Sequence, residues 1–431
     1  MTDEVGIMQH AIGSKPDPSH GYCTDDVARS LQVDLLHQRE LGWPAVADSA
    51  WRNVRFLTEA FDGRAGRFRN LRRIDGSWAA GAGSEDCHGR AMHALGDVIA
   101  AAPETALVDT AAALFERALP ATNALGALRA IASVALACDA AIGGGLRGPA
   151  ILTFRLMADQ LGRAFELRSA SKWRWPERRL TYENGLAVRA LIVAGKHRGT
   201  PRMIEVGVSV FDWLVAAQTA LDGHLSPVGN EWWSSGGPRS HFDQQPIEAT
   251  SLLLAAESAY SATGDPRYRT VMERAYGWFL GQNDVGVKVA DPDRGASYDG
   301  LTAGGVNQNQ GAESTLMWLM ALEHIRAIRR TGQPTPTPAR MAHSPPLIRS
   351  CGTARSPTRA AAVPHGLGVW ADIRTPIEGH AIRAQVLRNR PESMNQREAD
   401  TTLPVADRGP RSSNGNAAHS GPRNSCARTA T

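Results

Sequence analysis

The sequence has few cysteines and no long apolar run. Its five cysteines, among 431 residues, form no CxxC pair and show no spacing typical of metal ligands. We therefore expect reduced thiols, as in a reducing compartment. The first residues, MTDEVGIMQHAIG, have acids where a secretory signal needs basic residues, and no segment reaches the roughly 18 consecutive apolar residues of a membrane span. These absences predict a cytoplasmic protein without a membrane-spanning segment.

The chain also lacks a strong charge of one sign over its first three quarters. The formal net charge is +4, but residues 333–431 alone have 13 Arg, no Lys and 6 acidic residues. The residues before them have a slight excess of acids, and nothing there indicates a nucleic-acid or membrane partner.

The segment 333–431 is rich in Pro, Arg, Ser and Ala and keeps no apolar period. We expect it to be a disordered tail, because such a chain cannot bury enough surface to offset its ordering entropy. A basic tail that binds nucleic acid, or an out-of-frame reading of a GC-rich gene, is the alternative. Residues 1–332 then form the one folded domain.

Helical periodicity is abundant and strand alternation is almost absent. The helices that start near residues 24, 85, 122, 181, 244 and 310 are apolar on nearly every side, whereas the helices between them have a clearer polar face. Six buried helices, each followed by a more amphipathic one, predict an all-α (α/α)6 toroid, although the twelfth helix is not found. The predicted helices are 24–38, 44–61, 85–100, 104–118, 122–141, 147–167, 181–195, 201–218, 244–262, 266–281 and 310–330.

Dense polar clusters precede four of the buried helices, in SHGYCTDDV, GSEDCHGR, FDQQPIEA and NQNQGAES. Helix capping explains part of each cluster, since acids stabilise helix N-termini. Capping does not need the aromatic rings and amides beside the acids. All inner helices of a toroid run in the same direction, so the clusters are expected to meet at one rim. Carboxylates, amides and indole rings together are typical of carbohydrate recognition.

Cleavage of a glycosidic bond needs two carboxyl groups, one protonated and one ionised. Asp86 and Asp243 are the first candidates, because each opens a predicted inner helix among hydrogen-bonding or aromatic neighbours, and Glu313 is the third. We expect no metal and no cofactor. The predicted sugar-binding side chains are Tyr22, Asp25, Asp26, Glu85, His88, Arg90, Glu231, Trp232, Gln244, Gln245 and Gln310.

The stretches GIMQHAIGSKPDPSHGYCTDDVARSL, GSEDCHGRAMHALG, LSPVGNEWW, FDQQPIEA and VNQNQGAESTL together resemble a bacterial family of six-hairpin, glycosidase-like (α/α)6 domains. Domains of this family occur alone or fused behind a glycosyltransferase domain. The resemblance covers about residues 2–328 and implies carbohydrate activity without implying a specific reaction. Val27 stands where the family pattern leads us to expect Asn. The chain has no nucleotide-sugar-binding α/β domain of its own.

Three functions stay open at this point. The first is an enzyme that acts on glycosidic bonds of an oligo- or polysaccharide. The second is a sugar epimerase, whose general base would be a histidine at the rim. The third is a non-catalytic glycan-binding module that assists a glycosyltransferase encoded nearby. The histidines considered for the second function are His10, His20, His88 and His241.

Overall fold

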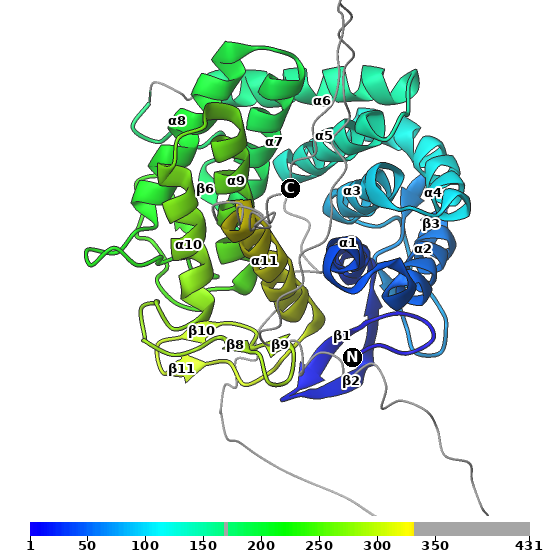
Figure 1. Cartoon of the computed structure of the whole chain (residues 1–431), viewed down its shortest axis with the longest axis horizontal. Helices are drawn as coiled ribbons and strands as arrows, with labels where there is room; N and C mark the ends of the chain where they lie inside the picture. Colours follow the sequence, from blue (N-terminus) through cyan, green and yellow to red (C-terminus); the bar gives the residue numbers. More distant parts are fainter. Residues whose placement is uncertain (168–170, 332–431) are drawn as a thin grey trace, which may run out of the picture. The chain divides into compact units, whose positions relative to one another are not determined.

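The computed structural model describes residues 1–167 and 171–331. This part of the chain contains eleven α-helices, in agreement with the eleven predicted from the sequence, and the (α/α)6 fold is confirmed (Figure 1). Their bounds are α1 Thr24–Leu41, α2 Ala47–Ala60, α3 Glu85–Ala101, α4 Thr105–Ala118, α5 Leu128–Gly143, α6 Pro149–Glu166, α7 Asn184–His197, α8 Pro201–Ala217, α9 Pro246–Thr263, α10 Arg267–Phe279 and α11 Ala312–Thr331.

The odd-numbered helices form the inner ring. Successive members pack against one another from α1 to α9, and α11 lies beside α1, to which it is joined by an ion pair between Glu313 and Arg29. Their composition explains this position, because a helix that is apolar on all sides is stable only when buried. In α9, for example, Leu252, Leu253 and Ala255 point in different directions and all are fully buried.

Glycines allow two of the inner helices to approach closely. A Cβ atom added at Gly96 of α3 would overlap the carbonyl oxygen of Ala137 in α5, and one added at Gly89 would lie 3.0 Å from the carbonyl oxygen of Ala130. Side chains larger than hydrogen at these two positions would therefore push α3 and α5 apart.

The even-numbered helices form the outer layer and are amphipathic. In α2, Val54 and Leu57 face the core, while Arg55 and Glu59 are exposed. Within residues 1–167 and 171–331, α11 has no outer partner, so the twelfth helix of an ideal toroid is not found here either.

Strands are more frequent than the sequence predicted. β1 (Met8–Ile12) and β2 (Lys15–Cys23) form an antiparallel hairpin, and β5 (Leu71–Arg72) pairs with β2 to complete a three-stranded sheet. The turn between β1 and β2 contains Gly13 with a positive φ. β2 includes two prolines, which cannot donate to a ladder, and this explains why no strand was predicted there.

The remaining strands are two-residue pairs in the long loops. β3 (Phe61–Asp62) pairs with β4 (Arg67–Phe68), and β6 (Arg179–Leu180) pairs with β7 (Trp233–Ser234). Between α10 and α11, β8 (Ala290–Asp291) pairs with β9 (Ala296–Ser297), and β10 (Leu301–Thr302) pairs with β11 (Gly305–Val306). These pairs fix the loops that precede α3, α7, α9 and α11.

Several helix starts lie a few residues later than predicted, among them those of three inner helices. α5 begins at Leu128 rather than at residue 122, because a 3-10 helix, Leu119–Ala124, with a proline in its first turn precedes it. α7 begins at Asn184 instead of residue 181. α9 begins at Pro246, not at residue 244, which agrees with the preference of proline for the first helical position.

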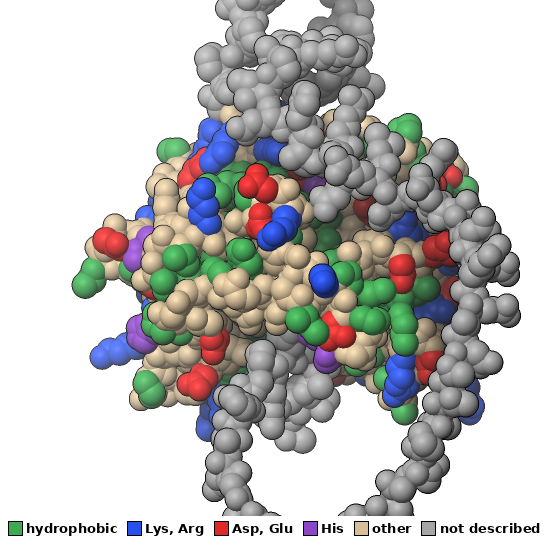
Figure 2. All heavy atoms as spheres, turned by 90° about the horizontal axis from the view of Figure 1, so that it is seen from below, with side chains coloured by type: hydrophobic (Ala, Val, Ile, Leu, Met, Phe, Trp, Pro, Cys, Tyr) green, Lys and Arg blue, Asp and Glu red, His purple; other side chains and the backbone are tan. Residues whose placement is uncertain are grey.

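The surface agrees with a nearly balanced charge. On the face shown in Figure 2, acidic and basic side chains are interspersed, and neither sign gathers into a patch. No helix among the described residues is both long and apolar enough to cross a membrane. The predicted disordered tail, 333–431, lies outside the described residues.

Candidate functional site

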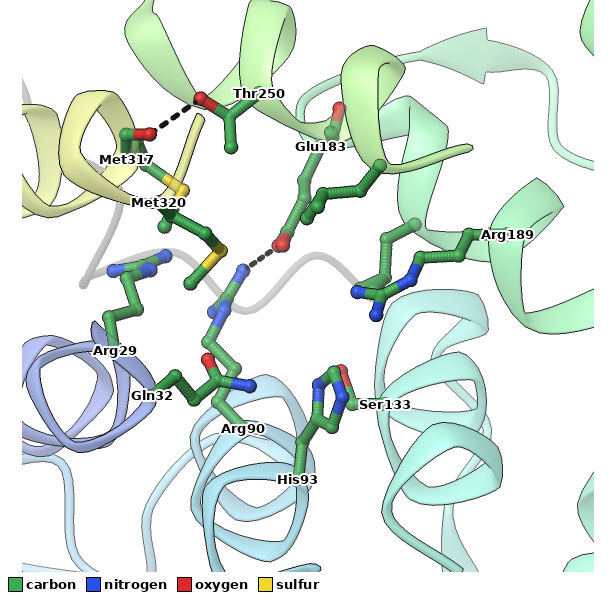
Figure 3. A pocket seen from close by; sticks show the side chains of 13 residues that line it. Arg29, Gln32, Arg90, His93, Ser133, Glu183, Arg189, Thr250, Met317 and Met320 are labelled. Carbon is green, nitrogen blue, oxygen red and sulfur yellow. Dashed lines mark hydrogen bonds and ion pairs between the residues drawn. The ribbon is translucent and has the colours of Figure 1, made fainter. Parts of the chain in front are cut away.

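A central cavity is lined by side chains from all six inner helices (Figure 3). It lies in the N-terminal halves of these helices, on the side where the predicted polar clusters stand. The lining residues are Arg29 and Gln32 of α1, Arg90 and His93 of α3, Ser133 of α5, Glu183, Leu186 and Arg189 at α7, Thr250, Ser251 and Leu254 of α9, and Met317 and Met320 of α11.

Three arginines occupy the same position in three of these helices. Arg29, Arg90 and Arg189 are the sixth residues of α1, α3 and α7. At 1.5 Å of rise per residue, each Cα lies about 7–8 Å below the start of its helix. The guanidinium groups are therefore placed below the acidic residues that begin α1 and α3.

Arg29 joins two carboxylates from different helices. Its Nη1 lies 2.8 Å from Oδ1 of Asp26, and its Nη2 lies 3.0 Å from Oε2 of Glu313 on α11. Burial raises the pKa of Asp26 to about 7, because the attraction of Arg29 only partly offsets desolvation and the charges of Glu313 and Asp25 add to the rise. Asp26 can thus take up or release a proton near neutral pH, beside a more exposed carboxylate.

Arg90 joins the next two carboxylates around the ring. Its Nη1 lies 2.7 Å from Oδ2 of Asp25, and its Nη2 forms an ion pair with Glu183, which precedes α7. These contacts link α1, α3 and α7 across the cavity and explain how a cation can be buried there.

Asp86 lies in a second arginine-rich environment. The hydroxyl of Tyr182 donates a hydrogen bond to Oδ2 of Asp86, and Nε of Arg129 lies 3.5 Å from the same oxygen. Burial alone would raise the pKa of Asp86, but Arg90, Arg129 and the Tyr182 hydrogen bond outweigh it and hold the pKa below its usual value. Asp86 is therefore ionised at neutral pH, while Asp26 is near its midpoint.

Glu183 has a left-handed backbone conformation, with φ of 51°. Such a conformation costs about 1–3 kcal/mol for a residue other than glycine and is concentrated at functional sites. The carboxylate of Glu248 holds it in place, since it accepts hydrogen bonds from the backbone N–H of Glu183 and from Nδ2 of Asn184, 3.1 Å away. Burial raises the pKa of Glu248 to about 7.

His93 is the cavity histidine among the described residues. Its Nε2 lies 3.8 Å from Asp97 of the same helix. Burial lowers the pKa of His93, with a contribution from the charge of Arg189 that opposes that of Asp97. A neutral imidazole can accept a proton, so His93 could serve as a general base.

Tyr22, Glu85 and His88 were predicted to bind sugar, and the structure gives each a structural contact. The Tyr22 hydroxyl donates to Asp3, and Glu85 accepts hydrogen bonds from the backbone N–H groups of residues 126 and 127, which precede α5. His88 is fully buried, with its ring centre 5.6 Å from that of Phe68. Tyr22 and His88 are buried and Glu85 is partly buried, and a role of these residues as sugar ligands stays a prediction.

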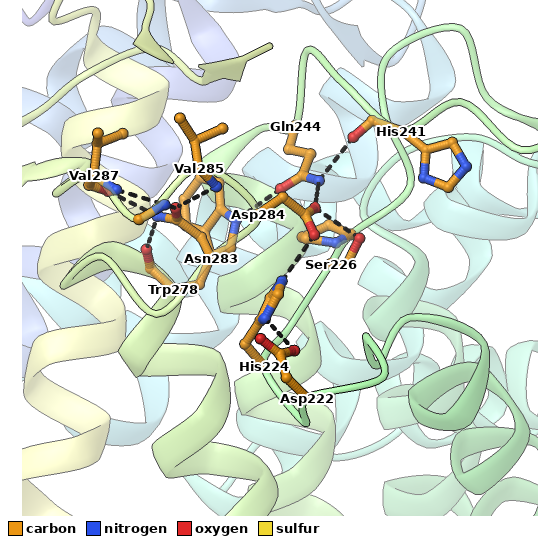
Figure 4. A network of polar contacts seen from close by, with 12 residues as sticks. Asp222, His224, Ser226, His241, Gln244, Trp278, Asn283, Asp284, Val285 and Val287 are labelled. Atoms are coloured by element: carbon orange, nitrogen blue, oxygen red, sulfur yellow. Dashed lines mark hydrogen bonds and ion pairs between the residues drawn. The ribbon is translucent and has the colours of Figure 1, made fainter. Parts of the chain in front are cut away.

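Gln244 is also fully buried, in a polar network beneath the rim (Figure 4). Its Nε2 donates to Asp284 and to the carbonyl oxygen of His241, and its Oε1 accepts from Nε1 of Trp278 at 2.9 Å. Asp284 in turn accepts from Ser226 and lies 2.8 Å from Nε2 of His224. Gln244 therefore anchors the loop before α9.

Asp243 does not begin α9, which corrects the sequence prediction. The N-cap residue is Gln245, and Asp243 is an exposed loop residue with φ of 57°. Glu231 is exposed on the same loop, and the ring of Trp232 lies 5.7 Å from the Arg179 guanidinium.

Gln310 is buried just before α11. Its Nε2 donates to Asp291 at 3.0 Å, and its Oε1 is buried without a hydrogen-bond partner. Of the predicted residues, the structure thus brings Asp25, Asp26, Asp86, Arg90 and Glu313 into one connected cluster around the cavity.

Sequence reasoning did not single out Arg189, His93 or Tyr182 as site residues. The signal for Arg189 was its sixth position in a buried helix, shared with Arg29 and Arg90. Within residues 1–167 and 171–331, no three His, Cys, Asp or Glu side chains gather in a way that could hold a metal ion.

No family model matches this chain, and no curated protein matches it. Solved structures do. A cellobiose 2-epimerase from Spirochaeta thermophila superposes with a TM-score of 0.60 at 15% identity, over 77% of this chain and 92% of that one. A D-mannose isomerase superposes with a TM-score of 0.55 at 11% identity, over 76% of this chain and 93% of that one. A GH76 α-mannanase from Bacteroides thetaiotaomicron superposes with a TM-score of 0.52 at 9% identity, over 72% of this chain and 87% of that one.

The chain has the six-hairpin, glycosidase-like (α/α)6 fold. At such low identities the likeness shows the fold alone. Function has to be argued from the cavity and its rim.

Proposed function

We propose that this six-hairpin protein binds a sugar over the inner-helix N-termini and acts on its glycosidic bond. One observation carries the proposal: the environments of two carboxyl groups in the first turns of inner helices push their pKa values apart. Asp86 is held ionised by Arg90 and Arg129, whereas burial raises the pKa of Asp26 to about 7. Such divergence separates the acid from the base in enzymes that use two carboxyl groups.

The exposure of these groups assigns their roles. The side chain of Glu313 is 26% exposed and that of Asp86 is 17% exposed, against 4% for Asp26. Glu313 and Asp86 are thus the carboxylates that a sugar can reach. Asp26 and Glu313 both pair with Arg29, so protonation of Asp26 would change the charge beside Glu313. Asp243, on its exposed loop, stays a candidate for substrate contact.

A sugar epimerase or isomerase is the second candidate. The position of His93 favours it, because a neutral imidazole in the cavity, beside Arg90 and Arg189, can remove a proton from a carbon next to a carbonyl group. The solved structures of similar fold include an enzyme named cellobiose 2-epimerase and one named D-mannose isomerase. The histidines considered from the sequence, His10, His20, His88 and His241, do not line this cavity.

Product analysis tests these candidates. The purified protein is incubated with mannose, cellobiose, cello-oligosaccharides and mannan, and products are resolved by chromatography and NMR. We expect new reducing ends. An isomerised or epimerised sugar would replace the first candidate by the second, and loss of this activity in His93→Gln would assign the base.

Binding without turnover would leave the third function, a glycan-binding module that assists a glycosyltransferase. Saturation-transfer NMR with the same sugars separates this outcome from inactivity. Neither binding nor turnover with any of these sugars would contradict the proposal.

A further inference from the structure

The three cavity arginines differ in their partners. Arg29 and Arg90 each form ion pairs with two carboxylates, whereas no ion pair or hydrogen bond joins Arg189 to another residue of the part of the chain that the structure describes. Its Nε atom is buried and without a partner. Figure 3 shows its side chain reaching from α7 toward the cavity.

The reason lies in the start of α7. α1 and α3 have acids in their first turns, but α7 has none there. The carboxylate that precedes α7, Glu183, is bound to Arg90 instead. The charge of Arg189 helps to lower the pKa of the nearby Glu257, but the ion pair of Glu257 is with His324, with 2.8 Å between Oε2 and Nδ1. Arg189 therefore has the position of the other two arginines without the carboxylates that accompany them.

We propose that Arg189 binds an anionic substituent of the substrate, a carboxylate or a phosphate, so that the protein prefers acidic sugars. This inference rests on the proposed function. A guanidinium group presents paired N–H donors that match the oxygens of either substituent. An anion here would give Arg189 the counter-charge that Asp26 and Glu313 give Arg29.

The size of the cavity favours a substituent over a whole ring. Its volume is about 40 Å³, and one water molecule needs about 10–15 Å³ by the same measure. A group of a few heavy atoms fits, whereas a pyranose ring does not. The ring would lie above, among Asp86, Glu313 and Tyr182, and its substituent would extend down to Arg189.

Binding of three sugars tests the inference. Affinities of the full-length protein for D-glucuronate, D-glucose 6-phosphate and D-glucose are measured by NMR titration at low salt. We expect one acidic sugar to bind at least about tenfold more tightly than glucose, as a charge-assisted contact implies. The comparison of glucuronate with the phosphate ester identifies the substituent.

Variants assign the preference to Arg189. In Arg189→Met, the acidic sugar should bind about as tightly as glucose, and the affinity for glucose itself should change little. Arg189→Lys should retain part of the preference for the acidic sugar. Arg163→Met, at an exposed position of α6, is the matched control and should behave as the wild type. Circular dichroism verifies that each variant is folded.

The outcomes separate the two proposals. If glucose binds and neither acidic sugar binds more tightly, or if Arg189→Met weakens glucose as much as the acidic sugars, the inference is wrong and the proposed function stands. If Arg189→Met fails to fold, the same comparison in Arg189→Lys decides. If none of the three sugars binds, the inference fails, and the tests with mannose, cellobiose, cello-oligosaccharides and mannan decide the proposed function.

Discussion

The guanidinium of Arg29 on α1 lies 3.0 Å from the carboxylate of Glu313 on α11, 284 positions further along the chain. This ion pair joins the first inner helix to the last. Because Arg29 also binds Asp26, one side chain contributes both to the closure of the ring and to the environment of the site's proton-binding group. Removal of either Arg29 or Glu313 therefore changes stability and chemistry together, so other positions are better suited to separate the two.

Asp86 and Asp243 offer such a separation. Asp86→Asn and Asp243→Asn should keep the fold, because Asn is isosteric and tolerates the left-handed backbone of Asp243. If both carboxylates act in the reaction, turnover should fall by about 10²–10⁴, the usual contribution of a positioned acid or base. Turnover and melting temperature are measured together, and Asp109→Asn, on the exposed side of α4, is the control. Full activity in an Asn variant would remove that residue from the mechanism.

The contribution of Asp34 to stability should decrease as pH rises from about 4 to about 7. Burial raises the pKa of Asp34 to about 7, above the value of about 3.9 in an unfolded chain. The folded state thus binds more protons than the unfolded state within this window, and each such group contributes a slope of up to about 1.4 kcal/mol per pH unit.

Asp34→Asn isolates one contribution to that slope. Asp34 accepts a hydrogen bond from Asn53 of α2 at 2.8 Å, and it does not line the cavity. Urea denaturation at pH 5 and pH 8 should show a smaller difference in unfolding free energy for this variant than for the wild type. An unchanged difference would show that Asp34 is ionised in the folded protein at pH 5.

Glu248→Ala should destabilise the protein through the segment at the start of α7. The variant leaves the backbone N–H of Glu183 and the amide of Asn184 without their acceptor, which costs about 1–3 kcal/mol for a buried donor. Glu116→Ala on the exposed side of α4 is the control. Thermal denaturation monitored by circular dichroism measures the loss of stability. A loss equal to that of the control would mean that Glu183 keeps its left-handed conformation without the hydrogen bonds of Glu248.

A protein that ends at residue 332 should keep the helicity and melting temperature of the full chain. The prediction follows from the loss of apolar periodicity after that residue. Circular dichroism and calorimetry of the two proteins test it. A substantially lower melting temperature of the shorter protein would show that residues 333–431 supply the missing partner of α11.

The alternation of buried and amphipathic helices could be predicted, because the distribution of apolar and polar residues around each helix shows whether it is buried on all sides. α5 is apolar on nearly every side, whereas α2 has an exposed face that includes Arg55 and Glu59. The hairpin of β1 and β2 could not be predicted, because its prolines mask the strand and its partner residues define it only after folding.

The site could be predicted only in part, because the sequence shows its acids but not their partners. Acids at the starts of α1 and α3 indicated the rim, but the sequence does not show which arginine each acid binds. Arg90 binds Glu183, which is 93 positions further along the chain and lies close in sequence to Arg189. Only the geometry of the ring shows this pairing, and that Arg189 has no ion pair with the other residues that the structure describes.

The glycines that bring α3 against α5 also affect the position of Arg90, which lines the central cavity. Replacement of Gly96 by alanine would push α3 away from the carbonyl of Ala137, and Arg90, one and a half turns earlier on α3, would move with its helix. A single methyl group outside the cavity could thus alter which substituents fit inside it. Selection for a different sugar could act on the contacts between helices while every side chain that touches the sugar stays the same.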